Sequence, residues 1–122
     1  MLWLINTKEQ KKGEIKLNNS MTYCGMTYFD ENDLKQAKFN HKIELEYYKT
    51  KQNTEDELKY GIEIRKKEYL NNCITEEKNN IENITDSSEK VIEIINTLKK
   101  YKVTPIGLND VLEDLLKLNL ES

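Results

Sequence analysis

The spacing of apolar residues changes once along this sequence, and the change limits the folds open to it. Between residues 42 and 65, apolar and polar side chains alternate, which is the period of a half-buried β-strand. After residue 88, apolar residues recur every three or four positions, which is the spacing of one helix face. Strands followed by helices in one short chain indicate an α+β fold.

The alternating part predicts an antiparallel sheet of three to four strands. Residues 42–51 and 58–65 each alternate, and about five polar residues separate them, so we expect a hairpin. Residues 67–85 are less regular. The apolar residues expected to form a third strand and a short fourth one are Tyr69, Leu70, Cys73, Ile74, Ile81 and Ile84. Turn-prone pairs at Asn71-Asn72 and Asn79-Asn80 are expected to separate them.

The helical part predicts an αα-hairpin. Asp86 can cap a first helix, with Glu89 completing a capping box. Its apolar face consists of Val91, Ile94, Ile95, Leu98 and Tyr101. Thr104 is the expected N-cap of a second helix, with Pro105 at its first position. The apolar stripe of that helix consists of Leu108, Val111, Leu112, Leu115 and Leu118. Both stripes need cover, so we expect the hairpin to pack on one face of the sheet.

A chain of 122 residues fits one domain. Residues 1–20 show no apolar period, and we expect a flexible N-terminal extension, followed by a single α+β domain over residues 21–122. Residues 21–40 are rich in aromatic side chains that either dock on the core as a strand or turn, or stay loose. Met21 is an alternative start of the functional chain.

Composition argues against several functional classes. The net charge is −3, and Arg65 is the only arginine among 19 basic residues, which disfavours nucleic-acid binding. Neither a signal segment nor a membrane-spanning run is apparent. Cys24 and Cys73 are isolated, as is usual for reduced thiols in a cytoplasmic protein.

The sequence holds no recognisable catalytic or cofactor-binding motif. The four glycines are scattered, so no phosphate-binding loop is expected. His41 is the only histidine, which disfavours a common metal site, and we expect it on the surface. We therefore expect no enzyme, no cofactor and no metal.

Five residues are candidates for contact with a partner. Asp110, Glu113 and Asp114 lie on the side of the second predicted helix away from its apolar stripe, and with Glu121 they outnumber Lys117. Such a face either attracts a basic partner or only keeps the protein soluble. Tyr48 and Tyr69 are the other two candidates, because an outward tyrosine on a strand suits a contact surface.

These features predict a small protein-interaction or regulatory module. The alternative is a nucleic-acid-associated regulator that uses a basic N-terminal arm with Lys8, Lys11, Lys12 and Lys16. The expected partner is another protein, nucleic acid and membrane are not expected, and a homodimer stays open.

Two segments resemble a small family of uncharacterised clostridial proteins. They are Tyr60-Gly61-Ile62-Glu63-Ile64 and the stretch from Val103-Thr104-Pro105-Ile106 to Val111-Leu112-Glu113-Asp114. The resemblance covers roughly residues 41–118 and implies a clostridial source and the order hairpin, helix, helix. It implies no activity, so no functional residue carries over. The chain departs from the pattern at Gly107, where histidine is common in the family.

Overall fold

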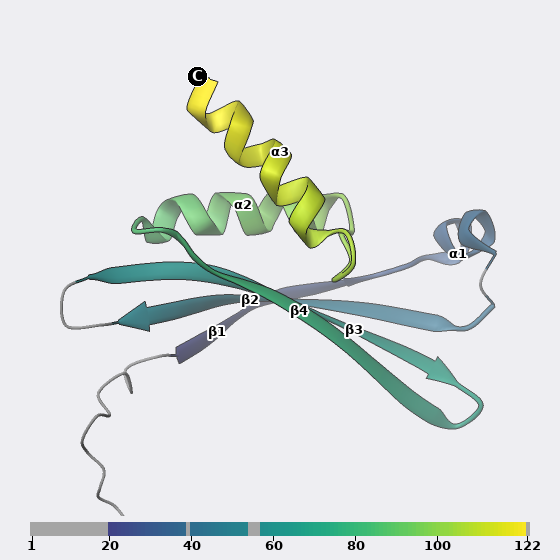
Figure 1. Ribbon diagram of the computed structural model, residues 1–122. Helices are drawn as coiled ribbons and strands as arrows, with labels where there is room; N and C mark the ends of the chain where they lie inside the picture. Colours follow the sequence, from purple (N-terminus) through teal and green to yellow (C-terminus); the bar gives the residue numbers. More distant parts are fainter. Residues whose placement is uncertain (1–19, 39, 54–56, 122) are drawn as a thin grey trace, which may run out of the picture.

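The computed structural model describes residues 20–38, 40–53 and 57–121, with side chains to residue 117. In these residues, a four-stranded antiparallel sheet of order β1-β2-β3-β4 carries α2 and α3 on one face (Figure 1). The elements are β1 (Ser20–Tyr28), α1 (Glu31–Ala37), β2 (Lys42–Asn53), β3 (Leu58–Leu70), β4 (Cys73–Thr85), α2 (Ser88–Lys100) and α3 (Leu108–Glu121). The predicted α+β class is confirmed. The predicted N-terminal extension lies, except for Ser20, outside the described residues.

The hairpin of β2 and β3 forms where the alternation predicted it, and both strands are longer than predicted. Tyr47 pairs with Ile64 and Lys49 with Ile62, so these side chains share the face under the helices. The Tyr47 hydroxyl is buried and donates to the Val103 carbonyl at 2.9 Å, and burial raises the pKa of Tyr47. This hydrogen bond ties the sheet to the segment between α2 and α3.

The predicted third strand and the predicted break at Asn79-Asn80 are wrong. Tyr69 and Leu70 extend β3, and β4 then runs without interruption through Asn79 and Asn80. The turn lies at Asn71-Asn72, with φ values of 51° and 65°, the conformation that a two-residue hairpin turn requires. The Asn79 amide donates to the Pro105 carbonyl at 3.0 Å, so tertiary contact supports it within a strand.

Strand β1 contains a bulge that separates two copies of the tripeptide Met-Thr-Tyr, at residues 21–23 and 26–28. The pairing with β2 shifts register between Tyr23 and Met26. Gly25 has φ 113°, which suits glycine, and Lys99 of α2 donates to the Cys24 carbonyl at 2.9 Å. Of the two alternatives for residues 21–40, docking on the sheet is therefore confirmed for β1.

Helix α2 begins one residue later than predicted. Ser87, rather than Asp86, is the N-cap, and its hydroxyl accepts from the backbone N–H of Lys90 at 3.1 Å. Tyr101 was predicted on the apolar face, but it follows the end of the helix and is 68% exposed. The helix ends before the residue that the periodicity assigned to its next turn.

Helix α3 begins at Leu108, so the predicted cap at Thr104 and first helical position at Pro105 are wrong. Thr104 to Gly107 form a turn, in which the Gly107 N–H donates to the Thr104 carbonyl at 3.1 Å. Pro105 is fully buried and therefore contributes to packing instead of starting the helix. The predicted apolar stripe holds in part, because Leu108 and Leu112 are buried.

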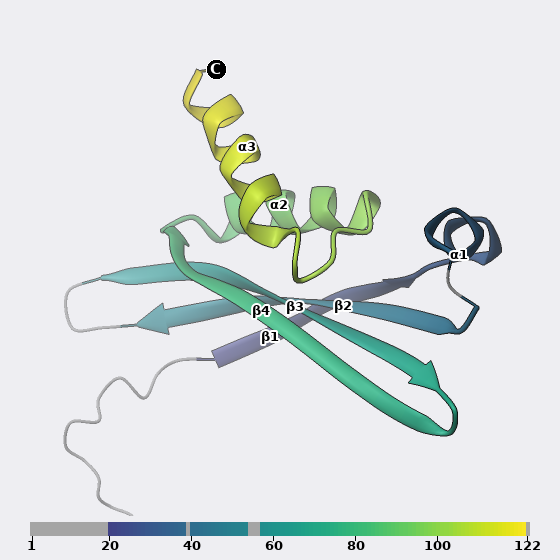
Figure 2. The ribbon, with the colours of Figure 1, turned by 45° about the vertical axis from the view of Figure 1, so that its right-hand side comes forward.

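The core lies between the sheet and the two C-terminal helices, which cover the same face of the sheet in both views (Figures 1 and 2). The buried residues that form it are Leu45, Tyr47, Ile62, Ile64, Val91, Ile94, Ile95, Leu98, Val103, Leu108 and Leu112. No helix in the described part of the chain is long and apolar enough to cross a membrane. The helices α2 and α3 thus cover one face of the sheet and leave the opposite face uncovered.

Candidate functional site

The face of the sheet opposite α2 and α3, the open face, carries a group of paired polar and aromatic side chains. Directly paired residues in antiparallel strands project to the same face. Tyr23 pairs with Tyr48, Tyr48 with Glu63, and Glu46 with Arg65, which places these five side chains together on the open face. The helices α2 and α3 lie on the other side of the sheet (Figure 2).

These five side chains are called the Tyr48 cluster: Tyr23, Glu46, Tyr48, Glu63 and Arg65. The Arg65 guanidinium lies 4.8 Å from the centre of the Tyr48 ring, and the Tyr23 ring meets the Tyr48 ring edge-on at 5.6 Å. The Arg65 Nε is 2.6 Å from Glu63 Oε2, and the Tyr48 hydroxyl donates to Glu46 at 3.0 Å. The side chains thus hold each other in one arrangement.

Charge and burial both act on the Tyr48 cluster. Burial raises the pKa of Tyr48, and its hydrogen bond to the Glu46 carboxylate raises it further. The ion pair with Glu63 raises the pKa of Arg65. Glu63 is only 6% exposed, so the arginine is what makes a buried carboxylate tolerable at this position.

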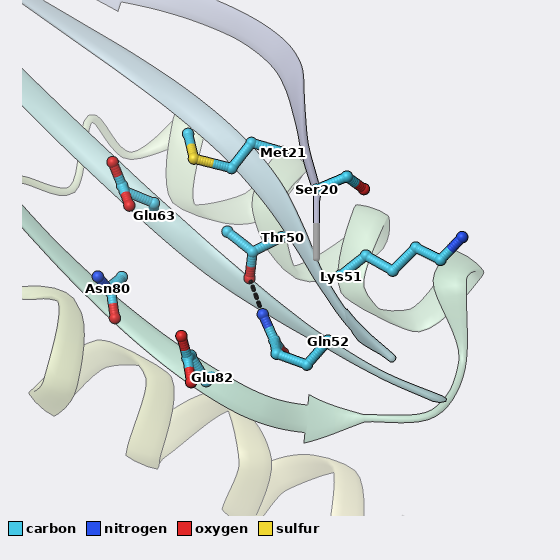
Figure 3. A pocket seen from close by; sticks show the side chains of 8 residues that line it. All are labelled: Ser20, Met21, Thr50, Lys51, Gln52, Glu63, Asn80 and Glu82. Atoms are coloured by element: carbon cyan, nitrogen blue, oxygen red, sulfur yellow. Dashed lines mark hydrogen bonds between the residues drawn. The ribbon is translucent and has the colours of Figure 1, made fainter. Parts of the chain in front are cut away.

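A hollow of about 460 Å³ opens beside the Tyr48 cluster (Figure 3). Its lining residues are Ser20, Met21, Thr50, Lys51, Gln52, Glu63, Asn80 and Glu82. Thr50, Gln52 and Glu63 are buried polar residues. The Gln52 amide donates to Thr50 Oγ1 at 2.9 Å and accepts from the Asn83 backbone N–H at 3.2 Å. The polar wall is therefore held in place from two strands.

The structure divides the five predicted contact residues between two layers. Tyr48 lies in the centre of the open face, and Tyr69 lies on the same face, opposite Lys42. Lys42, the β2 residue opposite Tyr69, is six residues from Tyr48, so the two tyrosines lie about 20 Å apart along the strands. Asp110, Glu113 and Asp114 are exposed on α3, in the other layer.

The surroundings of Tyr69 form a separate group. Its hydroxyl donates to Glu44 at 2.8 Å, and Lys42 lies 5.1 Å from the ring centre and 3.1 Å from Glu44. The hydrogen bond raises the pKa of Tyr69 and lowers that of Glu44. Tyr48 and Tyr69 therefore do not form one contact site.

Sequence reasoning missed the residues that build the site around Tyr48. Glu46 and Arg65 lie opposite each other across the hairpin. The ion pairs, however, join Arg65 to Glu63 and Glu46 to Lys67, the latter at 3.4 Å. The repeated Met-Thr-Tyr was the available signal for Tyr23. Glu63 gave no signal, because its burial depends on the neighbouring strands.

Potential metal ligands are scattered over the described residues. No group of three or more His, Cys, Asp or Glu side chains there is placed to hold a metal ion. His41 is less exposed than predicted: its side chain is 13% exposed, and its Nε2 lies 2.8 Å from Glu68 Oε1. Cys24 is half-buried and Cys73 is exposed.

The paired carboxylates predict an acid-sensitive fold. The hydrogen bond from His41 lowers the pKa of Glu68, and Lys66 at 3.1 Å adds to this; the Tyr69 hydroxyl similarly lowers the pKa of Glu44. A carboxyl whose pKa is lower in the folded state stabilises above its unfolded pKa, and this contribution is lost as the pH falls through the folded value. We expect the free energy of unfolding to decline below about pH 5.

Urea unfolding at several pH values measures this decline. Glu68→Gln should make the dependence on pH less steep, whereas Glu113→Gln, at an exposed position, should leave it unchanged. Equal slopes for the wild type and both variants would contradict the assignment to Glu68.

Comparison with known proteins gives a family but no activity. No curated protein matches the chain, and no solved structure matches it. Residues 26–118 match the family of unknown function DUF6514. The matched segment includes the second Met-Thr-Tyr of β1, the Tyr48 cluster except Tyr23, and the buried core of α2 and α3. Because the match spans more than half of its length, the chain belongs to the family of unknown function DUF6514.

Proposed function

We propose that this chain is a protein-interaction module whose partner binds the open face around the Tyr48 cluster. The observation that carries the proposal is the stack of Arg65 on Tyr48, with Tyr23 against it, on a sheet face that α2 and α3 leave uncovered. Tyrosine and arginine are the residue types that dominate binding energy at protein interfaces. Their mutual contacts reduce the side-chain entropy that a partner must overcome.

The hollow supports a basic side chain as the anchor of the partner. Its walls carry the carboxylates of Glu63 and Glu82 and the side-chain oxygens of Thr50 and Asn80, with Met21 as an apolar wall. Among the described residues that line it, Lys51 alone is cationic. A lysine or arginine that enters from a partner would meet several acceptors there.

The open face gives less support to the nucleic-acid alternative. Glu46 and Glu63 balance Lys67 and Arg65 in close pairs, so positive charge does not accumulate around Tyr48. The lysines of the predicted basic arm lie outside the described residues. The proposal is accordingly for a binding protein and not an enzyme, and the isolated Cys24 and Cys73 support the cytoplasm as its compartment.

Affinity capture from the host, followed by mass spectrometry, tests the proposal. Glu82→Lys reverses a charge at an exposed position of the hollow. We expect this variant to bind the captured partner about tenfold more weakly, or weaker still, and to keep the melting temperature of the wild type. Tyr48→Ala should have a similar effect. The matched control is Glu113→Lys with Asp114→Lys on α3, which should bind normally.

Two outcomes would contradict the open face as the binding surface. Loss of binding in the α3 variant alone would assign the contact to Asp110, Glu113 and Asp114. Retention of the wild type on heparin or DNA at physiological salt, without any protein partner, would favour the nucleic-acid alternative.

A further inference from the structure

Strand β1 is an edge of the sheet that lacks charged residues and proline, two of the usual protections against pairing. Within the described residues it pairs only with β2, so its outer backbone groups face no other strand. Natural edge strands carry charged residues or proline that discourage a second chain from pairing. The sequence of β1, Ser-Met-Thr-Tyr-Cys-Gly-Met-Thr-Tyr, contains neither, in a chain of which 34% is charged.

The other edge of the sheet differs. Strand β4 carries three exposed charged residues, Glu76, Lys78 and Glu82. Such features discourage strand addition. The two edges are therefore unequal, and β1 is the one open to pairing.

The side chains of β1 are also exposed to an unusual degree. Met21, Tyr23, Met26 and Tyr28 are 43%, 54%, 40% and 58% exposed, and all four project to the open face. Large apolar and aromatic residues that follow one another along an edge indicate a contact surface.

We propose that β1 pairs with β1 of a second copy of this chain, antiparallel, about a twofold axis between Cys24 and Gly25. This register places Met21 opposite Tyr28 of the second copy and Tyr23 opposite Met26. Each methionine then meets a tyrosine, a contact that is favourable between sulfur and an aromatic ring. Thr22 and Thr27 meet on the helix side, and paired threonines are also favourable across strands.

The bulge makes this self-complementarity possible. Residues 21 and 28 are an odd number of positions apart, so in a regular strand they would project to opposite faces and could not pair side by side. The extra residue at Cys24-Gly25 returns Met26 and Tyr28 to the face of Met21 and Tyr23. Each Met-Thr-Tyr copy can therefore lie antiparallel to the other copy in a second chain, with its methionine opposite a tyrosine.

A second copy fits this edge better than an unrelated strand does. In isologous pairing about a twofold axis, residue i of one copy meets residue j of the other, and residue j of the first meets residue i of the second. All four open-face residues of β1 meet a favourable partner under this condition. No charges oppose each other within the strand pair, because β1 has none. Met21 and Tyr23 also border the site proposed for a partner, but the dimer is tested on the chain alone, so its failure would leave the proposed function standing.

A charge-exchange experiment on the full chain tests both the partner and the register. Tyr23→Glu with Met26→Glu places like charges opposite each other twice across the seam, and Tyr23→Lys with Met26→Lys does the same with the other sign. We expect the wild type to dimerise in sedimentation equilibrium and each variant alone to dimerise at least about tenfold more weakly. An equimolar mixture of the two variants should restore the dimer.

Melting temperatures show whether the variants remain folded, which we expect because both positions are 40% exposed or more. A wild type that stays monomeric over the whole concentration series would overturn the proposal. Folded variants that dimerise as strongly as the wild type would also overturn it, because the dimer would then use another surface. A mixture that stays monomeric would overturn the register.

Discussion

Gly61→Ala is expected to lower the free energy of unfolding by about 3 kcal/mol. A Cβ atom at this position of β3 would lie 2.3 Å from the Ile81 carbonyl oxygen and 2.8 Å from the Glu82 Cα of β4. Both are backbone atoms, which cannot rotate away as the end of a side chain can. Thr50 Oγ1, also at 2.8 Å, limits movement toward β2. The strands must therefore separate where the pairing of β3 with β4 is already irregular.

Gly107→Ala is the matched control for this prediction. The atoms nearest to a Cβ there lie at 3.8 Å, which is an ordinary contact distance. We expect the free energy of unfolding to change by less than about 0.5 kcal/mol. Urea unfolding of both variants measures the difference. Equal stabilities would mean that β4 does not approach Gly61 as closely as the structure has it.

The sequence predicted the hairpin of β2 and β3 because the local pattern and the tertiary arrangement agree there. Ile43, Leu45 and Tyr47 alternate with polar residues, and all three are fully buried. Strand β4 shows no such alternation. Its Asn79 and Asn80 favour a turn in isolation, but the hydrogen bond of Asn79 to Pro105 fixes it in a strand. That contact joins residues 26 positions apart, which no local pattern contains.

The helix ends show the same limit on a smaller scale. Asp86 and Ser87 are both good N-caps, and only the geometry shows that Ser87 accepts the hydrogen bond from Lys90. Pro105 suits a first helical position, but its burial against the core places it in the preceding turn. Where two local solutions have similar energies, packing decides between them.

The candidate site was predictable only as far as it depends on alternation. Tyr48 follows an inward Tyr47, so its outward direction could be predicted. Its contacts with Tyr23 and Arg65 depend on strand register and, for Tyr23, on how β1 pairs with β2. The tripeptide at residues 21–23 is repeated at residues 26–28, but the sequence does not show that a bulge between the copies places their Met and Tyr side chains on the same face of the sheet.

Leu112→Asp is expected to abolish folding. Leu112 is 3% exposed and belongs to the core between α3 and the sheet, so a carboxylate there would have only apolar neighbours. The cost is several kcal/mol, comparable to the roughly 5 kcal/mol that stabilises a small domain. Leu112→Ala removes apolar contacts without adding charge and should cost about 2–5 kcal/mol. Circular dichroism and thermal melting measure both effects.

The neighbouring Glu113 supplies the control on the same helix. Glu113 is exposed, and Glu113→Ala should change stability by less than about 0.5 kcal/mol. The order of stabilities should therefore be Glu113→Ala, Leu112→Ala and Leu112→Asp, from most to least stable. A Leu112→Asp variant that melts within a few degrees of the wild type would show that α3 does not present this residue to the sheet. A large loss of stability in Glu113→Ala would instead indicate that the acidic face of α3, rather than its leucine stripe, meets the core.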